Sequence, residues 1–509
     1  MTGRARRALP VVAVLGLCLV VRLVMLGSSL TRLDGDEAVT GIMAQRILDG
    51  HHLAFFAGQA YQGSGEQYLQ ALVLALLPDT PFNLRLVQVG LAVLACGGVY
   101  VLARLVLGSE RRALLAATLF AVGPYFNVFW SVKSRGAYDT GLLAGLGGLL
   151  AALWVRPDDR RLALKALLFG GCCGLGFWAN WQAAYLLVPG AWWLLGTARG
   201  RWLVVVPVAA AGFIIGAAPS LGHLLLTGPI EASGPAAPSS IAARADGLLR
   251  TTVPSFVGAQ EGGVQLHRWL PPAAASIVTI AALGAALFQR RSGLWDLFRL
   301  RPGRCRPVDV LLAVTLIAPV LLVASKNSVG GAFPGYIFPL FAVMPVLLAA
   351  LPPPAGRRRW WPAAVAGAMV VALGLQSSLM ARRGFQYAPV GFDSSLGPTE
   401  TLPAVVEALE SAGVRVAYAD YWTAFPLQFL AGDRMVVSPF RNQRFPALAA
   451  LARAEPSPAL LVPIGPQADG VRAAIAASGS TATERHVEGL ALFTGRISRA
   501  VLEGLRSAR

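Results

Sequence analysis

The chain alternates long apolar runs with short connectors that carry polar and basic residues. Apolar runs of roughly 20 residues are long enough to cross a bilayer as helices, and such runs recur along most of the chain. We predict eleven membrane-spanning helices, at residues 8–27, 83–107, 113–131, 137–155, 163–179, 182–197, 202–226, 273–289, 308–324, 335–351 and 361–380.

The positive charges are not spread evenly over the connectors. Clusters of arginine and lysine recur in alternate connectors, at 4–7, 111–112, 156–165, 199–201, 290–306 and 357–359. Positive residues beside spans favour the cytoplasmic side, so these clusters predict a cytoplasmic N-terminus. They place residues 28–82, 132–136, 227–272 and 381–509 outside the cytoplasmic (inner) membrane.

Two parts follow from this pattern. Residues 1–380 are expected to form an α-helical polytopic membrane domain whose outer loop, 28–82, includes a short interfacial helix at 66–77. Residues 381–509 are expected to form a small extracytoplasmic α/β domain. Its predicted helix is LPAVVEALESAGV, and its predicted strands are VRVAYAD, RMVVS and PALLVPI.

Composition narrows the class of protein. Of 509 residues, 55% are hydrophobic and 14% are charged, with a net charge of +18. Because the basic residues lie in short clusters between spans, we expect them to face membrane lipids rather than nucleic acid. The five cysteines lie in predicted spans or a basic connector, so no disulfide framework is predicted.

Three acids stand within four positions just after the first span, in the sequence TRLDGDEAVTG. Asp36 and Glu37 come at the start of a segment with helical spacing, where a carboxylate can cap free N–H groups. Capping needs one carboxylate. Three acids at a membrane boundary also fit a base, a metal site or a cationic partner, with Asp34 the one expected to take no part.

The stretch GDEAVTGIMAQRILDG, followed by FFAGQAYQGSGEQYLQALVLALL, resembles the first outer loop of the GT-C glycosyltransferases. The similarity is to the protein mannosyltransferase and aminoarabinose transferase (ArnT-like) group, glycosyltransferase family 39-like. It extends to SVKSRGAYDTGLL, GFWANWQAAYLLVPGAWWLL, GYIFPLFAVMPVLLA and ADYWTAFPLQFLAGDR, and so covers most of the chain.

The resemblance implies transfer of a sugar from a polyprenyl-phosphate donor to an acceptor hydroxyl on a lipid, glycan or protein. It makes Asp36 the general base, supported by Glu37, with Asp139 as a second catalytic acid. Glu66 is then a ligand for a divalent cation such as Mg²⁺ or Mn²⁺. Helix capping remains the alternative for Glu66 and Asp139.

Basic residues in the predicted outer loops are scarce, and Lys133, Arg135 and Lys326 are among them. Departing phosphate requires positive charge, so we predict that these three bind the donor phosphate. Snorkelling to lipid headgroups is the alternative. Related proteins often have a basic residue before the aromatic of the tenth span, where this chain has Gly335 before Tyr336.

Aromatic and amide side chains near the predicted outer surface are candidates for binding sugar or acceptor. They are Tyr61, Asn180, Trp181, Gln182, Tyr336, Tyr421 and Trp422. A membrane-interface aromatic belt, or packing within a loop, is the alternative for the tryptophans. A polytopic transporter or flippase for a lipid-linked sugar is the alternative function, although transporters typically place acids near the bilayer midplane in repeated halves.

Overall fold

The structure is a computed structural model of the whole chain. It describes residues 3–28, 30–228, 240–261, 264–265, 272–301, 305–325, 333–351 and 401–507, with scattered positions between 360 and 378. The predicted span at 361–380 and Lys326 therefore lie largely or wholly outside the described residues.

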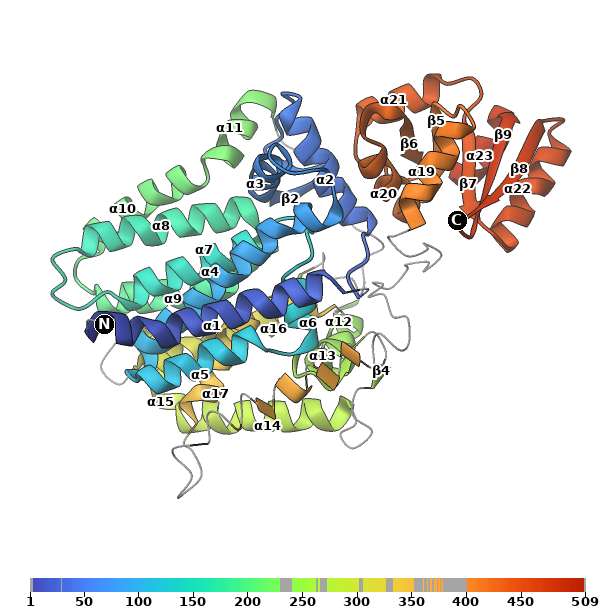
Figure 1. The fold of residues 1–509 in the computed structure, drawn as a ribbon. Coiled ribbons are helices and arrows are strands. Elements are labelled where there is room, and N and C mark those ends of the chain that lie inside the picture. Colours follow the sequence, from blue (N-terminus) through green and yellow to red (C-terminus); the bar gives the residue numbers. More distant parts are fainter. Residues whose placement is uncertain are drawn as a thin grey trace.

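The first 351 residues are mainly helical (Figure 1). Their helices and short strands are α1 (Gly3–Leu26), α2 (Gly35–Leu48), β1 (Phe55–Phe56), β2 (Gln59–Gly63), α3 (Gly65–Leu74), α4 (Pro81–Leu107), α5 (Glu110–Ala121), α6 (Tyr125–Trp130), α7 (Tyr138–Leu153), α8 (Leu162–Ala179), η1 (Trp181–Ala183), α9 (Ala184–Thr197), α10 (Trp202–Gly216), α11 (Ala218–Thr227), α12 (Ile241–Gly247), η2 (Leu248–Thr252), α13 (Val253–Phe256), β3 (Gln260–Glu261), β4 (Val264–Gln265), α14 (Pro272–Gln289), α15 (Arg291–Phe298), α16 (Pro307–Ala324), η3 (Pro334–Ile337) and α17 (Leu340–Ala350).

Residues 401–507, called the C-terminal unit below, contain helices and a mixed sheet. The elements are α19 (Leu402–Ser411), β5 (Val416–Ala419), α20 (Tyr421–Ala431), η5 (Gly432–Arg434), β6 (Val436–Pro439), α21 (Pro446–Ala454), β7 (Ala459–Pro463), α22 (Pro466–Ala477), β8 (Thr481–Val487), β9 (Leu490–Arg496) and α23 (Arg499–Ser507). The strand order is β6-β5-β7-β9-β8, with β5 parallel to β6 and β7, and β9 antiparallel to β7 and β8.

The apolar runs do form helices, and the chain is a multi-pass membrane protein, but eleven spans remain a prediction. Among the described residues, four helices are long and apolar enough to cross a bilayer: Ala8–Leu26, Pro81–Leu107, Leu162–Ala179 and Pro307–Ala324. A fifth is formed if α10 and α11, bent by 65°, are one span. The predicted interfacial segment at 66–77 is the short helix α3.

The run predicted as one span at 113–131 is broken between α5 and α6. Arg22 of α1, fully buried, donates from Nη2 to the carbonyl of Phe120 at 3.2 Å and also binds the Ala121 carbonyl. Asn127 donates to the same Phe120 carbonyl at 3.1 Å. Carbonyls freed at a helix end need such partners in an apolar setting, so the break is stabilised by a polar side chain from another helix.

Helices α8 and α10 pack closely because glycines face each other. A Cβ at Gly170 would lie 1.9 Å from the Ala209 carbonyl oxygen, and one at Gly212 would lie 2.2 Å from that of Leu167. Small residues at such spacing let two backbones approach in a membrane. The sequence GGCCG therefore has a packing function in this helix pair.

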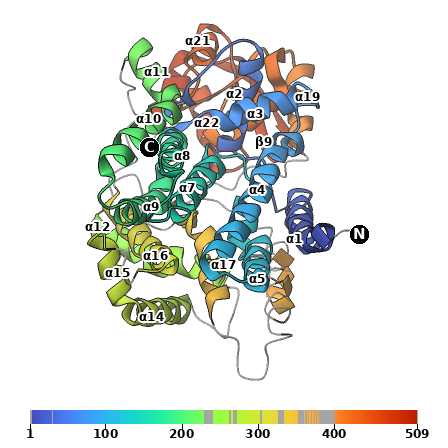
Figure 2. The same ribbon diagram turned by 90° about the vertical axis from the view of Figure 1, so that its left-hand side faces the viewer.

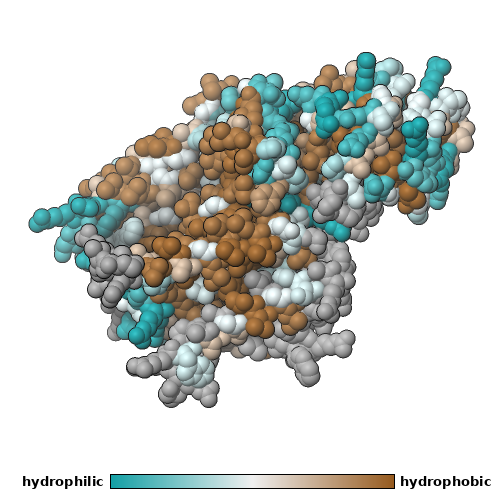
Figure 3. All heavy atoms as spheres, in the orientation of Figure 1, coloured by the Kyte–Doolittle hydropathy of each residue, from teal (hydrophilic) through white to brown (hydrophobic). Residues whose placement is uncertain are grey.

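The C-terminal unit lies at the end of the helical part opposite the N-terminus (Figure 1). Helices α2 and α3 also lie at this end, beside the C-terminal unit in a second view (Figure 2). Hydrophobic residues dominate the visible face over the helices, whereas hydrophilic residues gather on the C-terminal unit (Figure 3). Two of the segments predicted to be outside, the first outer loop and the C-terminal unit, thus lie at the same end of the bundle.

Candidate active site at the start of helix α2

Asp34, the acid expected to take no part in the chemistry, is the N-cap of α2. Its Oδ1 accepts from the backbone N–H of Glu37 at 3.1 Å, and its Oδ2 lies 2.9 Å from the Nε of Arg135 and from the Nζ of Lys133. Burial alone would raise the pKa of Asp34, but Arg135 and Lys133 outweigh it and hold that pKa below the ordinary value. Asp34 is therefore a buried anion that joins the helix start to the loop at 131–137.

Glu37 is fully buried and saturated with donors. Two nitrogens of Arg85, on α4, donate to its carboxylate: Nε to Oε1 at 2.8 Å and Nη2 to Oε2 at 2.7 Å. The backbone N–H of Ser134 donates at 2.9 Å, and Lys133 forms an ion pair with Oε2. A bidentate arginine and a second cation make Glu37 a structural anchor.

Lys133 and Arg135, predicted to bind phosphate, lie beside these two acids. The ammonium of Lys133 contacts Glu37, Asp34 and the carbonyl of Arg32, the last at 2.6 Å. An ammonium has three donors, so in this arrangement Lys133 is occupied. The guanidinium of Arg135 pairs with Asp34 and lies 5.0 Å from the centroid of the Trp130 ring.

Asp36 has different surroundings from its two neighbours. It is half-buried, and it forms none of the ion pairs found among the described residues. Its Oδ1 accepts a hydrogen bond of 2.7 Å from the hydroxyl of Tyr421, which lies in the C-terminal unit. It is close enough to interact electrostatically with Tyr61, Arg135 and Arg444. Asp36 is thus a carboxylate bordered by phenols and arginines.

Glu66 and Asp139 form a second acidic pair, on α3 and α7. Glu66 accepts from the backbone N–H of Thr140 and from Nε2 of Gln88, both at 2.9 Å. Asp139 interacts electrostatically with Glu66, and its Oδ1 has no hydrogen-bond partner among the described residues. Burial raises the pKa of Glu66 to about 7, although the donors from Thr140 and Gln88 oppose this shift.

The structure places the other predicted binding residues around the same end. Tyr61 is on β2, and Tyr336 is half-buried on η3, with its ring 5.1 Å from that of Phe333. Tyr421 and Trp422 begin α20, where Asp420 caps the helix by accepting from the Trp422 N–H at 2.8 Å.

Asn180, Trp181 and Gln182 form the turn from α8 into η1. The side chain of Asn180 accepts from the Gln182 N–H at 3.0 Å and so shapes the turn. Trp181 is 55% exposed and stacks on Phe177. An exposed tryptophan ring at this position is typical of the aromatic residues found at a membrane–water interface.

Several residues of the site were not singled out in the sequence: Arg85, Ser134, Gln88 and Arg444. Arg85 lies within α4, and its buried charge in a predicted span is the signal that could have found it. Arg444 gave no signal, because it lies among other arginines of the C-terminal unit and its contact to Tyr421 is tertiary.

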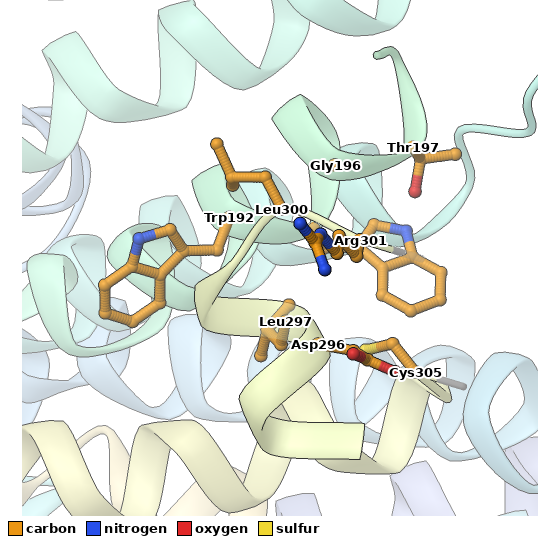
Figure 4. Close-up of a pocket in the computed structure, with 9 residues that line it drawn as sticks. Trp192, Gly196, Thr197, Asp296, Leu297, Leu300, Arg301 and Cys305 are labelled. Carbon is orange, nitrogen blue, oxygen red and sulfur yellow. The ribbon is translucent and has the colours of Figure 1, made fainter. Parts of the chain in front are cut away.

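A separate pocket lies between α9 and α15 (Figure 4). These two helices lie toward the end of the molecule where the N-terminus lies (Figure 1). Trp192, Thr197, Asp296, Arg301 and Cys305 are among its lining residues. None of the residues that line it belongs to the cluster around Asp36, so the acidic site and this pocket are distinct.

Comparison with known proteins found one matching family model and several similar solved structures. Residues 65–224 match the family model described as dolichyl-phosphate-mannose-protein mannosyltransferase. The crystal structure of ArnT from Cupriavidus metallidurans bound to undecaprenyl phosphate matches with a TM-score of 0.60 at 14% identity, covering 95% of this chain and 97% of that one. Its apo state matches with a TM-score of 0.61 at the same identity and coverage. No curated protein sequence matches the chain.

The two ArnT structures share the fold of this chain over nearly its whole length, whereas the family model covers residues 65–224. The chain therefore has the fold of the GT-C superfamily of membrane glycosyltransferases, as the acidic motif after the first span predicted.

Proposed function

We propose that the chain transfers a sugar from a polyprenyl-phosphate donor to an acceptor hydroxyl on the outer side of the cytoplasmic membrane. The observation that carries this proposal is the contrast among the three acids at the start of α2. Asp34 and Glu37 are neutralised by Arg85, Lys133 and Arg135, whereas Asp36 is bound only by a phenol hydroxyl among the described side chains. A carboxylate with a spare oxygen can accept a proton.

The reaction is a single displacement. Asp36 takes the proton of the acceptor hydroxyl as that oxygen bonds to the anomeric carbon of the sugar. The bond from this carbon to the phosphate oxygen breaks, and polyprenyl phosphate leaves. One base suffices, so the configuration at the anomeric carbon inverts. Arg135, with Lys326 from the sequence, supplies charge for the phosphate, while Lys133 holds Asp34 and Glu37 in place.

The acceptor and sugar contacts are assigned by position. Tyr421 binds the Asp36 carboxylate, and Tyr61 interacts with it electrostatically. Tyr61, Tyr336, Tyr421 and Trp422 are assigned to stacking on, or hydrogen-bonding, a sugar. Asn180 and Gln182 are proposed to contact hydroxyl groups farther along the outer surface, beside Trp181.

The test is transfer by purified protein from a panel of polyprenyl-phosphate sugars, with released polyprenyl phosphate measured by mass spectrometry. Asp36→Asn is expected to lower turnover by ~10²–10⁴-fold, the usual contribution of a general base. Asp49→Asn is the matched control, because Asp49 is exposed at the other end of α2. Full turnover by Asp36→Asn would exclude Asp36 as the base.

A divalent cation fits the pair Glu66 and Asp139. Two buried carboxylates, one with an unpartnered oxygen, offer the oxygen ligands that Mg²⁺ and Mn²⁺ prefer. Among the described residues, no three His, Cys, Asp or Glu side chains are arranged so that they could hold a metal ion together, so substrate phosphate or water would complete the coordination. Bound there, the cation would supply positive charge for the donor phosphate.

Binding of Mn²⁺ to the purified protein, followed by isothermal titration, tests this site without any substrate. Glu66→Gln is expected to remove the binding, and Glu407→Gln, on α19 of the C-terminal unit, is expected to keep it. Equal Mn²⁺ binding by wild type and Glu66→Gln would exclude the site.

A further inference from the structure

Tyr421, the first residue of α20, connects the C-terminal unit to the proposed base. Its hydroxyl donates to Oδ1 of Asp36 at 2.7 Å, although the two residues are 385 positions apart in sequence. No hydrogen bond among the described residues reaches Oδ2 of Asp36. The contact therefore fixes one carboxylate oxygen and leaves the other for a substrate.

Arg444 fixes the hydroxyl of Tyr421 in turn. Its Nε donates to that hydroxyl at 3.3 Å, and its Nη1 donates to the carbonyl of Gly58 at 3.0 Å. Gly58 has a φ of +71°, and a Cβ there would lie 2.9 Å from Arg444 Cδ. Since the hydroxyl of Tyr421 accepts from Arg444, its proton is directed to Asp36.

The contact lies in a packed interface rather than at a loose surface. A Cβ at Gly35 would lie 2.8 Å from the ring of Tyr421, and one at Gly41 would lie 2.5 Å from the ring of Phe429. Behind them, α2 and α20 share one apolar cluster that includes Val39, Ile42, Met43, Phe425, Phe429 and Phe445. Close packing of this kind holds side chains in a single arrangement.

We propose that Tyr421 is a positioning residue, which holds the Asp36 carboxylate so that Oδ2 faces the acceptor hydroxyl, and that Arg444 orients Tyr421. The inference rests on the proposed function, and it makes the C-terminal unit a part of the active site. Burial, together with the charge of Asp36, raises the pKa of Tyr421 well above its ordinary value, so the phenol stays a donor at neutral pH.

Kinetics of Tyr421→Phe test the positioning role. We expect kcat to fall roughly tenfold, the scale of one lost hydrogen bond to a charged group, with KM for the donor unchanged. The acidic limb of the pH–kcat profile should move to higher pH, because the ionised carboxylate loses a donor. Tyr418→Phe is the matched control, since it removes a hydroxyl that binds Arg506 at 2.7 Å elsewhere in the same unit.

A second readout needs no substrate. In a thermal-unfolding cycle of Asp36→Ala, Tyr421→Phe and the double variant, the two losses should be non-additive because the side chains bind each other. Additive losses, or wild-type kcat and pH profile for Tyr421→Phe, would overturn the inference. If wild type yields no product with any donor while the cycle still shows coupling, the proposed function fails and the Tyr421–Asp36 contact stands.

Discussion

Glu37 and Asp36 are adjacent in sequence, yet their side chains are bound by different partners. Glu37 receives a bidentate arginine, a lysine and a backbone N–H, whereas Oδ1 of Asp36 receives one phenol hydroxyl. A carboxylate whose two oxygens are both bound by cations has no oxygen left for a substrate. Whether an acid at this helix start has a structural or a catalytic function therefore depends on the side chains that bind it, and not on whether it is Asp or Glu.

Glu37→Gln should therefore destabilise the fold. It leaves the buried guanidinium of Arg85 without its anion and removes one of the two carboxylates that pair with Lys133, and breaking a buried pair costs about 3–5 kcal/mol. Thermal unfolding in detergent measures the loss. Asp36→Asn is the comparison, since it keeps an oxygen for Tyr421 and should change stability by less than ~1 kcal/mol. Equal destabilisation by the two variants would contradict the assignment.

Asp34 gives the chain a pH-dependent term of stability. Arg135 and Lys133 hold the folded pKa of Asp34 below its unfolded value, so the ion pairs stabilise the fold above that value and are lost as the pH falls. Asp34→Asn keeps a good N-cap but removes the charge. The difference in melting temperature between wild type and Asp34→Asn should be constant from about pH 7 to 5 and shrink below about pH 4. A difference that grows on acidification would contradict this.

The sequence could predict some of these residues and not others. Asp36, Glu37, Lys133 and Arg135 were found because charges are rare in so apolar a chain. The ion pairs of these residues could not be predicted from the sequence. Arg85 and Glu37 lie 48 positions apart, and the loop with Lys133 and Arg135 could face water as well as acids. The ion pairs of Asp34 could not be predicted, because a helix cap and an ion-pair partner look alike in a single sequence.

At the scale of elements, close packing of α8 on α10 depends on glycines whose missing Cβ leaves room for backbone. Gly170→Ala should push the helices apart, with a loss of about 1–3 kcal/mol from overpacking. Gly171→Ala, the next residue, is the control, because its Cβ would meet nothing closer than 3.8 Å. Melting temperatures of the two variants in detergent measure the effect. Equal values would mean that α8 and α10 do not pack in this register.

Helices were predicted better than strands and breaks. The runs at 163–179 and 182–197 correspond to α8 and α9, because apolar length alone identifies them. The break between α5 and α6 depends on Arg22 from another helix, which periodicity does not report. Strands β8 and β9 were not predicted. Five of the seven residues of β8 are polar or charged, and the buried residues lie in its partner β9.

At the scale of the whole molecule, the C-terminal unit is attached to α2 by a shared apolar cluster and by Tyr421 and Arg444. Sequence patterns predicted that this part contains a helix and three strands, but not where it docks. Docking depends on shape. Two glycines of α2 have no side chains and so leave room for aromatic rings from residues almost 400 positions later in the sequence.

The arrangement requires α2 and the C-terminal unit to lie on the same side of the membrane. Basic connectors predict that this side is the outer one. In a chain whose five cysteines are replaced by alanine, Asp49→Cys and Ser457→Cys should react with a membrane-impermeant maleimide in intact cells. Asp158→Cys, in the basic connector after α7, should react only after permeabilisation. All three positions are exposed or in an exposed connector, so a failure to react reports sidedness and not burial. Labelling at position 158 alone in intact cells would invert the topology and place Asp36 in the cytoplasm, where the donor and acceptor proposed for it would not meet.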